Sequence, residues 1–152
     1  MDNDMSKYYS RKVMLPWLYG ISFRRYNEQD LVNALRQSGA YIPELSLVAE
    51  IDGRIAGHIM FTKVQIGESV QLALAPLSVL PEYQRQGIGS ALIREGHKRA
   101  GELGYGYSIV LGSEAYYPKA GYNGHAKTWP LKCIKTEPSY PCFGPMEQGC
   151  VF

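Results

Sequence analysis

The chain has 152 residues, which is enough for one domain with a buried core and short for two domains. Its 45% hydrophobic and 20% charged residues are typical of a folded globular protein and exclude a disordered one. The 16 basic and 14 acidic residues nearly balance, which argues against nucleic-acid binding, because nucleic-acid-binding proteins usually carry a clustered basic stripe.

The N-terminal part is the hardest to assign. Residues 1–12 are polar, and we expect them to be flexible. Residues 13–23 are apolar and follow basic residues, but they contain Pro16 and Gly20, lack a small-residue cleavage site and are too short to span a bilayer. We therefore interpret them as core material of a cytoplasmic protein that does not associate with membranes.

The first clear helix is predicted over residues 28–37, where an apolar stripe ends before Ser38 and Gly39. The stripe consists of Leu31, Val32, Ala34 and Leu35.

A hairpin is predicted next. Residues 45–51 alternate as a strand, and Asp52-Gly53 is a strong signal for a type I′ turn, because glycine tolerates a positive φ. Residues 54–66 return as the partner strand, and residues 71–80 form a third strand, in which Pro76 predicts a bulge. One face of the partner strand is expected to present Ile55, Gly57, Ile59 and Phe61.

The second half predicts a crossover. Residues 90–103 have helical spacing, and residues 107–111 are expected to form a strand parallel to the third strand. A short helix follows over residues 114–119, and residues 123–152 are irregular, with one or two strands at most. Together these elements predict an α/β (α+β) fold with a mixed, mostly antiparallel sheet flanked by helices, in a single domain over residues 1–152.

Three cysteines lie close to the C-terminus, at Cys133, Cys142 and Cys150. Their spacing does not fit a zinc site, and we expect no metal. Free thiols in a reducing compartment are the favoured interpretation, with a single disulfide as the alternative.

Residues 77–92 are the most informative stretch, because they combine a strand, a short turn and the start of a helix. Gly87 and Gly89 leave the backbone open to a close ligand, and the amides from Gly87 to Ser90 would lie unpaired at the positive end of the helix dipole. Arg85 adds a full positive charge. The pattern predicts a phosphate-bearing ligand, although an ordinary strand-to-helix loop is the alternative.

The motif Gln84-x-x-Gly87-x-Gly89 resembles the acetyl-CoA pyrophosphate signature of the GNAT superfamily of N-acetyltransferases. Its position after an apolar strand and before a helix is the context that such a motif requires. The dinucleotide-binding fingerprint fits less well, because Leu92 stands where its third glycine belongs.

A second stretch resembles the same family. Residues 116–122 match the aromatic-Tyr-x-x-x-Gly-aromatic element that follows the fifth strand of many GNAT enzymes, and Tyr117 falls on the tyrosine that lies near the sulfur of coenzyme A there. Tyr116 we assign to the core. The resemblance covers residues 28–122 and implies that the third strand splays from its parallel neighbour.

The resemblance also implies an activity and a site. Acetyl would move from acetyl-CoA to a primary amine by direct attack in a ternary complex, and Tyr117 would protonate the departing thiolate as a general acid. Backbone groups of residues 77–79 would pair with the pantetheine, and an amide there would stabilise the oxyanion. The expected acetyl-CoA-binding residues are Leu77, Ser78, Val79, Gln84, Arg85, Gln86, Gly87, Ile88, Gly89 and Ser90.

Several points stay open. The sequence does not single out a general base; the candidates are Glu44, Glu50, Glu82, Glu114, His58, His97 and His125, and a water chain would also serve. The acceptor amine is open between a small molecule and a peptide, and the resemblance allows a homodimer. A non-catalytic scaffold that binds acyl-CoA as a sensor or partner subunit is the alternative function.

Overall fold

The computed structural model describes residues 8–10, 28–111, 116–120, 122–124 and 131–135. Within these ranges the strands form one seven-stranded sheet in the order β1-β2-β3-β4-β5-β7-β6. The strands are β1 (Tyr8–Ser10), β2 (Tyr41–Ile51), β3 (Arg54–Ile66), β4 (Ser69–Val79), β5 (Tyr107–Leu111), β6 (Asn123–Gly124) and β7 (Leu131–Lys135). The helices are α2 (Glu28–Gln37), α3 (Ile88–Glu102) and two short 3₁₀ helices, η2 (Pro81–Tyr83) and η3 (Tyr117–Ala120).

The centre of the sheet is the antiparallel meander β2-β3-β4. Asp52 and Gly53 both have positive φ, 49° and 76°, as a type I′ turn requires, so the predicted hairpin is confirmed. The bulge predicted at Pro76 is also present, because the β3–β4 register shifts between the pairs Phe61–Leu74 and Ile59–Leu77.

One expectation about β3 is wrong. Ile55 does not share the face of Ile59 and Phe61; it packs with Val48 and Leu80 in a separate cluster. The β2–β3 register shifts between Ala49 and Glu50, which moves Ile55 to the opposite face of the sheet.

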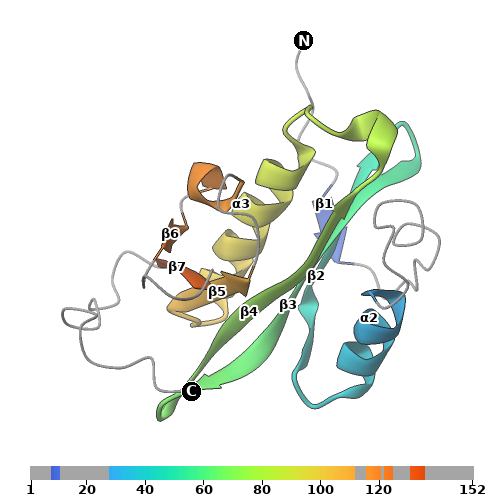
Figure 1. Ribbon diagram of the computed structural model, residues 1–152. Coiled ribbons are helices and arrows are strands. Elements are labelled where there is room, and N and C mark those ends of the chain that lie inside the picture. The colour runs from blue at the N-terminus through green and yellow to red at the C-terminus, as the bar shows by residue number, and fades with distance from the viewer. Residues whose placement is uncertain (1–7, 11–27, 112–115, 121, 125–130, 136–152) are drawn as a thin grey trace.

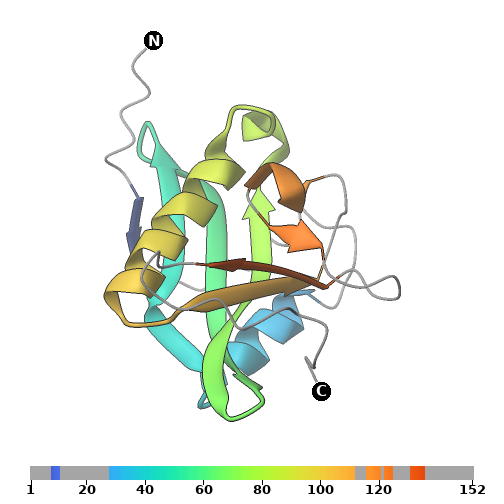
Figure 2. The same cartoon turned by 90° about the vertical axis from the view of Figure 1, so that its left-hand side faces the viewer.

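The two described α-helices cover opposite faces of the sheet (Figures 1 and 2). On one face, α3 packs over the main core, in which Phe61 and Leu92 are completely buried. On the other face, α2 packs Val32 against Met60 of β3. The predicted stripe of α2 is partly wrong: Val32 is buried, but Leu31 is 46% exposed, because the helix turns Val32 toward the sheet.

The crossover through α3 makes β4 and β5 the one parallel pair among the described strands. Their pairing covers only Leu72–Leu74 of β4 against Ser108–Val110 of β5, although β4 continues to Val79. The predicted fold class, with a splayed parallel pair in a mostly antiparallel sheet, is therefore confirmed.

No helix in the described ranges is long and apolar enough to cross a membrane. The expectations for residues 1–7, 11–27 and 136–152, including Cys142 and Cys150, lie outside the described residues.

Candidate functional site

The loop between β4 and α3 is fixed by its own glutamines. The Gln84 side-chain amide donates a hydrogen bond of 3.0 Å to the carbonyl oxygen of Val79 at the end of β4. The Gln86 amide donates one of 2.9 Å to the carbonyl oxygen of Glu82 in η2. These two side chains therefore hold the loop against the strand end and shape its path into α3.

The helix that follows begins without a side-chain cap. Gly87 is the N-cap residue with a left-handed φ of 83°, and as a glycine it has no side chain that could cap the first backbone amides of α3. The first-turn amides of a helix have no partner within it, and this first turn contains no acidic residue. Space around Gly87 is open, because a Cβ there would meet no atom within 4 Å. A phosphate group fits such a bare helix end.

Arg85 lies beside this helix end in an unusual conformation. It is exposed, and its φ of 61° lies in the left-handed region that non-glycine residues rarely adopt. Strained backbone of this kind is concentrated at ligand-binding sites. The loop thus presents a cation next to the open amides.

Tyr116 contributes to the same helix end, which sequence reasoning missed. The residue is 38% exposed, not part of the core, and its hydroxyl occupies the space that a Cβ on Gly89 would fill. Burial raises the pKa of the Tyr116 hydroxyl, and a hydrogen bond with Ser90 partly offsets this rise. Gly89 is therefore required for the tyrosine hydroxyl to approach the first turn of α3.

Tyr117 lies one residue further on and is half-buried against the core. Its ring meets the rings of Tyr116 and Tyr122 edge-on, at centroid distances of 5.2 and 5.7 Å. Burial, followed by the neighbouring Tyr116, raises the pKa of Tyr117. The phenol is therefore protonated at neutral pH, which is the form that can donate a proton.

A buried polar network holds Tyr122 in place. Its hydroxyl shares hydrogen bonds of 2.8 Å with Nε2 of His97 and 3.0 Å with the hydroxyl of Ser108. The ring of His97 also packs against Phe61. Because α3 and β5 supply these partners, the network fixes the aromatic wall against which Tyr117 rests.

The predicted pantetheine-binding residues lie where β4 leaves β5. Leu77, Ser78 and Val79 pair with β3 and have no register partner on β5. Ser78 is buried, and among the described residues its hydroxyl has no hydrogen-bond partner. Leu77, Val79 and Tyr117 pack in the core on the α3 side, where the loop from Gln84 to Ser90 begins that helix, whereas Ser78 projects to the other face of the sheet.

The candidate bases fall into two groups. His58 and His97 are buried, and burial lowers their pKa values to about 3 and about 4, with Arg36 as a further cause for His58. Glu44 and Glu82 are exposed, and Glu50 is partly exposed. Glu114 and His125 lie outside the described residues. Within the described ranges, no group of three or more His, Cys, Asp or Glu could hold a metal ion.

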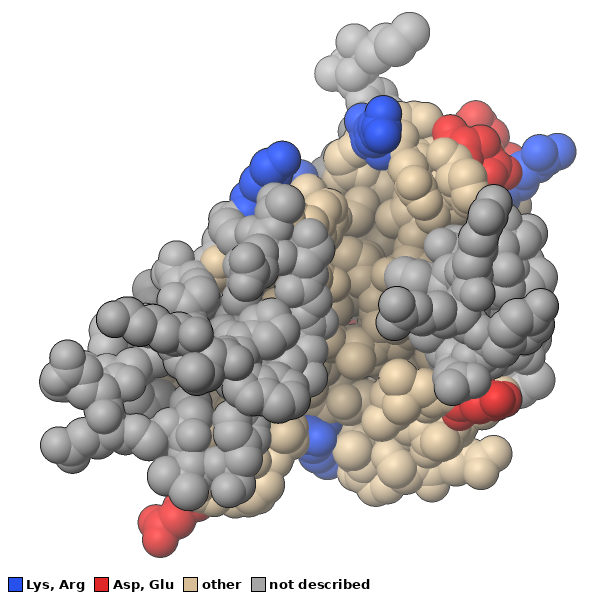
Figure 3. Space-filling view, in the orientation of Figure 1, with Lys and Arg blue, Asp and Glu red and all other residues tan. Residues whose placement is uncertain are grey.

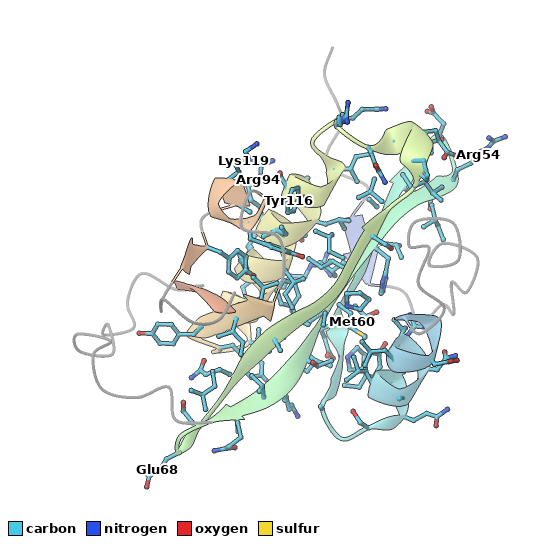
Figure 4. The ribbon with its side chains drawn as sticks, viewed as in Figure 1. Arg54, Met60, Glu68, Arg94, Tyr116 and Lys119 are labelled. Carbon is cyan, nitrogen blue, oxygen red and sulfur yellow. The ribbon has the colours of Figure 1, made fainter. Side chains whose placement is uncertain are left out.

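The surface over the splayed strands is mostly uncharged. Figure 3 shows a hollow down this face of the molecule, with a tan floor and with Lys, Arg, Asp and Glu at its margins. In Figure 4, Tyr116 projects from the same part of the molecule as the exposed basic residues Arg94 and Lys119. Arg85, Arg94 and Lys119 bring positive charge to this part of the molecule, and the one described carboxylate in the preceding loop, Glu82, is exposed.

Known proteins are similar to this chain in sequence and in fold. Two curated relatives from Escherichia coli are named uncharacterized N-acetyltransferases: YjhQ is 39% identical over 62% of this chain and 55% of its own length, and YhbS is 36% identical over 66% and 61%. The chain thus spans less than two thirds of the length of these relatives.

Two crystal structures are similar to this chain in fold. YhbS from E. coli, solved with CoA, superimposes with a TM-score of 0.73 at 28% identity, over 82% of this chain and 75% of its own. A GNAT acetyltransferase from Brucella melitensis, solved with acetyl-CoA, gives 0.70 at 33% identity, over 93% and 87%. The model of the Acetyltransferase (GNAT) family matches residues 12–122, a span that holds the bare helix end, the splayed strands and Tyr117. The chain belongs to the GNAT family of acetyltransferases.

Proposed function

We propose that this protein is an acetyl-CoA-dependent N-acetyltransferase that acetylates a primary amine by direct attack in a ternary complex. The observation that carries the proposal is the uncapped N-terminus of α3 at Gly87, next to a strand that parts from its parallel neighbour after Leu74. The CoA and acetyl-CoA complexes of the two solved relatives support the same ligand.

The residues present fit the cosubstrate. The backbone amides of Gly87, Ile88, Gly89 and Ser90 would hold the pyrophosphate, with the charge of Arg85 beside them. Leu77 to Val79 would pair with the pantetheine in the gap toward β5. The bound cosubstrate supplies an activated acetyl thioester.

Tyr117 is the proposed general acid. Its raised pKa keeps the hydroxyl protonated until the thiolate departs, and the edge-on contacts with Tyr116 and Tyr122 restrict the ring to one orientation. The acceptor must arrive as, or become, a neutral amine, because an alkylammonium has no lone pair for attack. We assign the role of proton acceptor to no side chain; a chain of water molecules to the solvent would also serve.

The experiment begins with calorimetric titration of acetyl-CoA, with NAD as the control ligand. We expect saturable one-to-one binding of acetyl-CoA and none of NAD. Release of the CoA thiol is then measured over a panel of primary amines. Folded protein that does not bind acetyl-CoA would refute the proposal, and binding without thiol release from any amine would favour a non-catalytic scaffold.

Two neighbouring tyrosines give a matched pair for the acid assignment. Tyr117→Phe should lower turnover by about 10²–10⁴-fold with unchanged acetyl-CoA affinity. Tyr116→Phe removes a hydroxyl that contacts the helix end, so it should change acetyl-CoA affinity and leave the chemical step intact. Equal turnover in wild type and Tyr117→Phe would end the assignment of Tyr117.

A further inference from the structure

A buried polar cluster lies on the face of the sheet covered by α2, opposite to the face that packs against α3. Met60 of β3 packs against Val32 of α2, and Figure 4 shows Met60 between the sheet and this helix. His58 lies two residues before Met60 and therefore faces the same way. Nε2 of His58 lies 3.0 Å from the hydroxyl oxygen of Ser46 on β2.

Arg36 brings a positive charge to this face. It lies one helical turn after Val32 and so projects from the same side of α2. Its side-chain nitrogens Nε and Nη2 are both buried, and among the described residues neither has a hydrogen-bond partner. Burial and, secondarily, the charge of Arg36 lower the pKa of His58 to about 3, so the histidine is neutral and the positive charge at this cluster comes from Arg36.

This arrangement is costly without a ligand. A buried cation and its N–H groups lose their hydration, and the loss is large unless an anion or acceptor replaces the water. The position of Arg36 in the last turn of α2 favours a positive charge, but an exposed side chain would satisfy the helix dipole equally well. The dipole therefore does not account for the burial of these two nitrogens.

The two buried nitrogens of Arg36 are arranged so that they could bind a carboxylate. Nε and Nη2 form one edge of the guanidinium, and such an edge binds the two oxygens of a carboxylate in a bidentate pair. Of the described carboxylates, Asp30 and Glu44 are exposed and Glu50 of β2 is partly exposed, and none of them forms a hydrogen bond with Nε or Nη2 of Arg36. The anion that fits this edge is thus more readily supplied from outside.

The cluster also adjoins the segment of β4 that we assign to the pantetheine. Ser78 lies directly opposite His58 in the β3–β4 register and therefore projects to the same face. Ser78 belongs to the segment of β4 that has left β5, and its buried hydroxyl has no partner among the described residues. Arg36 and Ser78, whose buried polar atoms have no partner in the described part of the chain, thus lie near His58 between α2 and the splayed strands.

We propose that Arg36 binds the carboxylate of the acceptor, so that the substrates are small amines that carry a carboxylate, such as free amino acids, and not protein N-termini. This inference rests on the proposed acetyl transfer. The hydroxyl of Ser78 would accept or donate a hydrogen bond to the same molecule at the edge of the splay.

The test compares amines that differ only in the carboxylate. Thiol release is measured for free amino acids and for their carboxamides at saturating acetyl-CoA; an amide imitates the N-terminal residue of a peptide. The wild type should prefer the acids by about 10- to 100-fold in kcat/KM, as expected for one bidentate charged pair. Arg36→Met should abolish this preference, and Arg36→Lys should retain part of it.

Controls separate this role from a structural one. Arg54→Gln removes an exposed arginine at the hairpin turn and should keep the preference. Arg36→Met should not lower the thermal unfolding midpoint, because the two buried nitrogens that it removes have no hydrogen-bond partner among the described residues; a large decrease would show an internal partner and overturn the proposal. Equal rates for acids and amides in the wild type would overturn it as well.

A second readout works without turnover. In ¹⁵N-labelled protein loaded with CoA, the Nε–H resonance of Arg36 is identified by its loss in Arg36→Lys. A pool of amino acids should shift this resonance, and a pool of their amides should not. A shift without any acetyl transfer would support the carboxylate site while refuting the proposed function; no shift with either pool would refute the site.

Discussion

Because two histidines are buried, we expect the free energy of unfolding to decrease steeply when the pH falls from 6.5 to 5. His58 and His97 are both buried, and burial lowers their pKa values from 6.5 to about 3 and about 4. In the unfolded chain both rings bind a proton below about pH 6.5. In the folded protein both stay neutral down to the lowered values, so acid favours the unfolded state.

The magnitude follows from these pKa values. At pH 5 each histidine is about 1.5 pH units below its unfolded pKa and still above its folded pKa. At 1.36 kcal/mol for each unit, each ring costs about 2 kcal/mol of the free energy of unfolding, and the pair costs about 4 kcal/mol. Domains are stable by about 5–15 kcal/mol in total, so this loss is readily measurable. The stability is fully present above pH 6.5 and is lost as the pH falls.

The assay is urea unfolding followed by circular dichroism at half-unit steps between pH 7 and 5, a window in which carboxylates contribute little. Near pH 5 these two rings should lower the wild-type free energy of unfolding by about 2.7 kcal/mol for each unit by which the pH falls. His58→Gln and His97→Gln should each reduce that slope by half, whatever their own effect on stability. Slopes equal to that of the wild type would refute the argument that the rings are neutral when folded.

Three further predictions concern particular contacts. Gly87→Ala and Gly53→Ala should each lower stability by about 1–2 kcal/mol, because both glycines have positive φ, but calorimetry should find weaker acetyl-CoA binding only for Gly87→Ala. Gly96→Ala should lower the unfolding midpoint, because its Cβ would overlap the ring of Phe61; an unchanged midpoint would mean that the ring moves at no cost. Tyr122→Phe should destabilise by about 1–3 kcal/mol in urea, because it deprives His97 and Ser108 of a shared buried partner.

Local signals predicted the scaffold well. The Asp52-Gly53 turn requires only its own backbone angles, and the bulge at Pro76 follows from a missing amide, so neighbouring residues decide both. The bare helix end at Gly87 is local in the same way. These features place most of the proposed acetyl-CoA site before any tertiary contact is known.

Long-range contacts decided what the sequence did not reveal. The partners of His97 and His58 lie 25 and 12 residues away, so spacing gave no sign of Tyr122 or Ser46. Nothing in the sequence distinguishes Arg36 from other charged residues of the helix. The burial of its nitrogens depends on how α2 packs against β3. The sequence predicts a core position for Tyr116, because nothing local shows that its hydroxyl reaches Gly89.

The division of the sheet into two faces explains why the site is built from such different groups. On the α3 face, backbone amides and Tyr116 meet at a helix end, an arrangement suited to a phosphate common to every acyl-CoA. On the α2 face, the proposed acceptor site consists of side chains such as Arg36, and side chains can differ between relatives without loss of the fold. The segment of β4 after Leu74 is the described strand segment that leaves β5 and carries Ser78 toward α2. A change of acceptor specificity should therefore arise from substitutions on the α2 face, while substitutions at Gly87 or Gly89 should impair every acceptor equally.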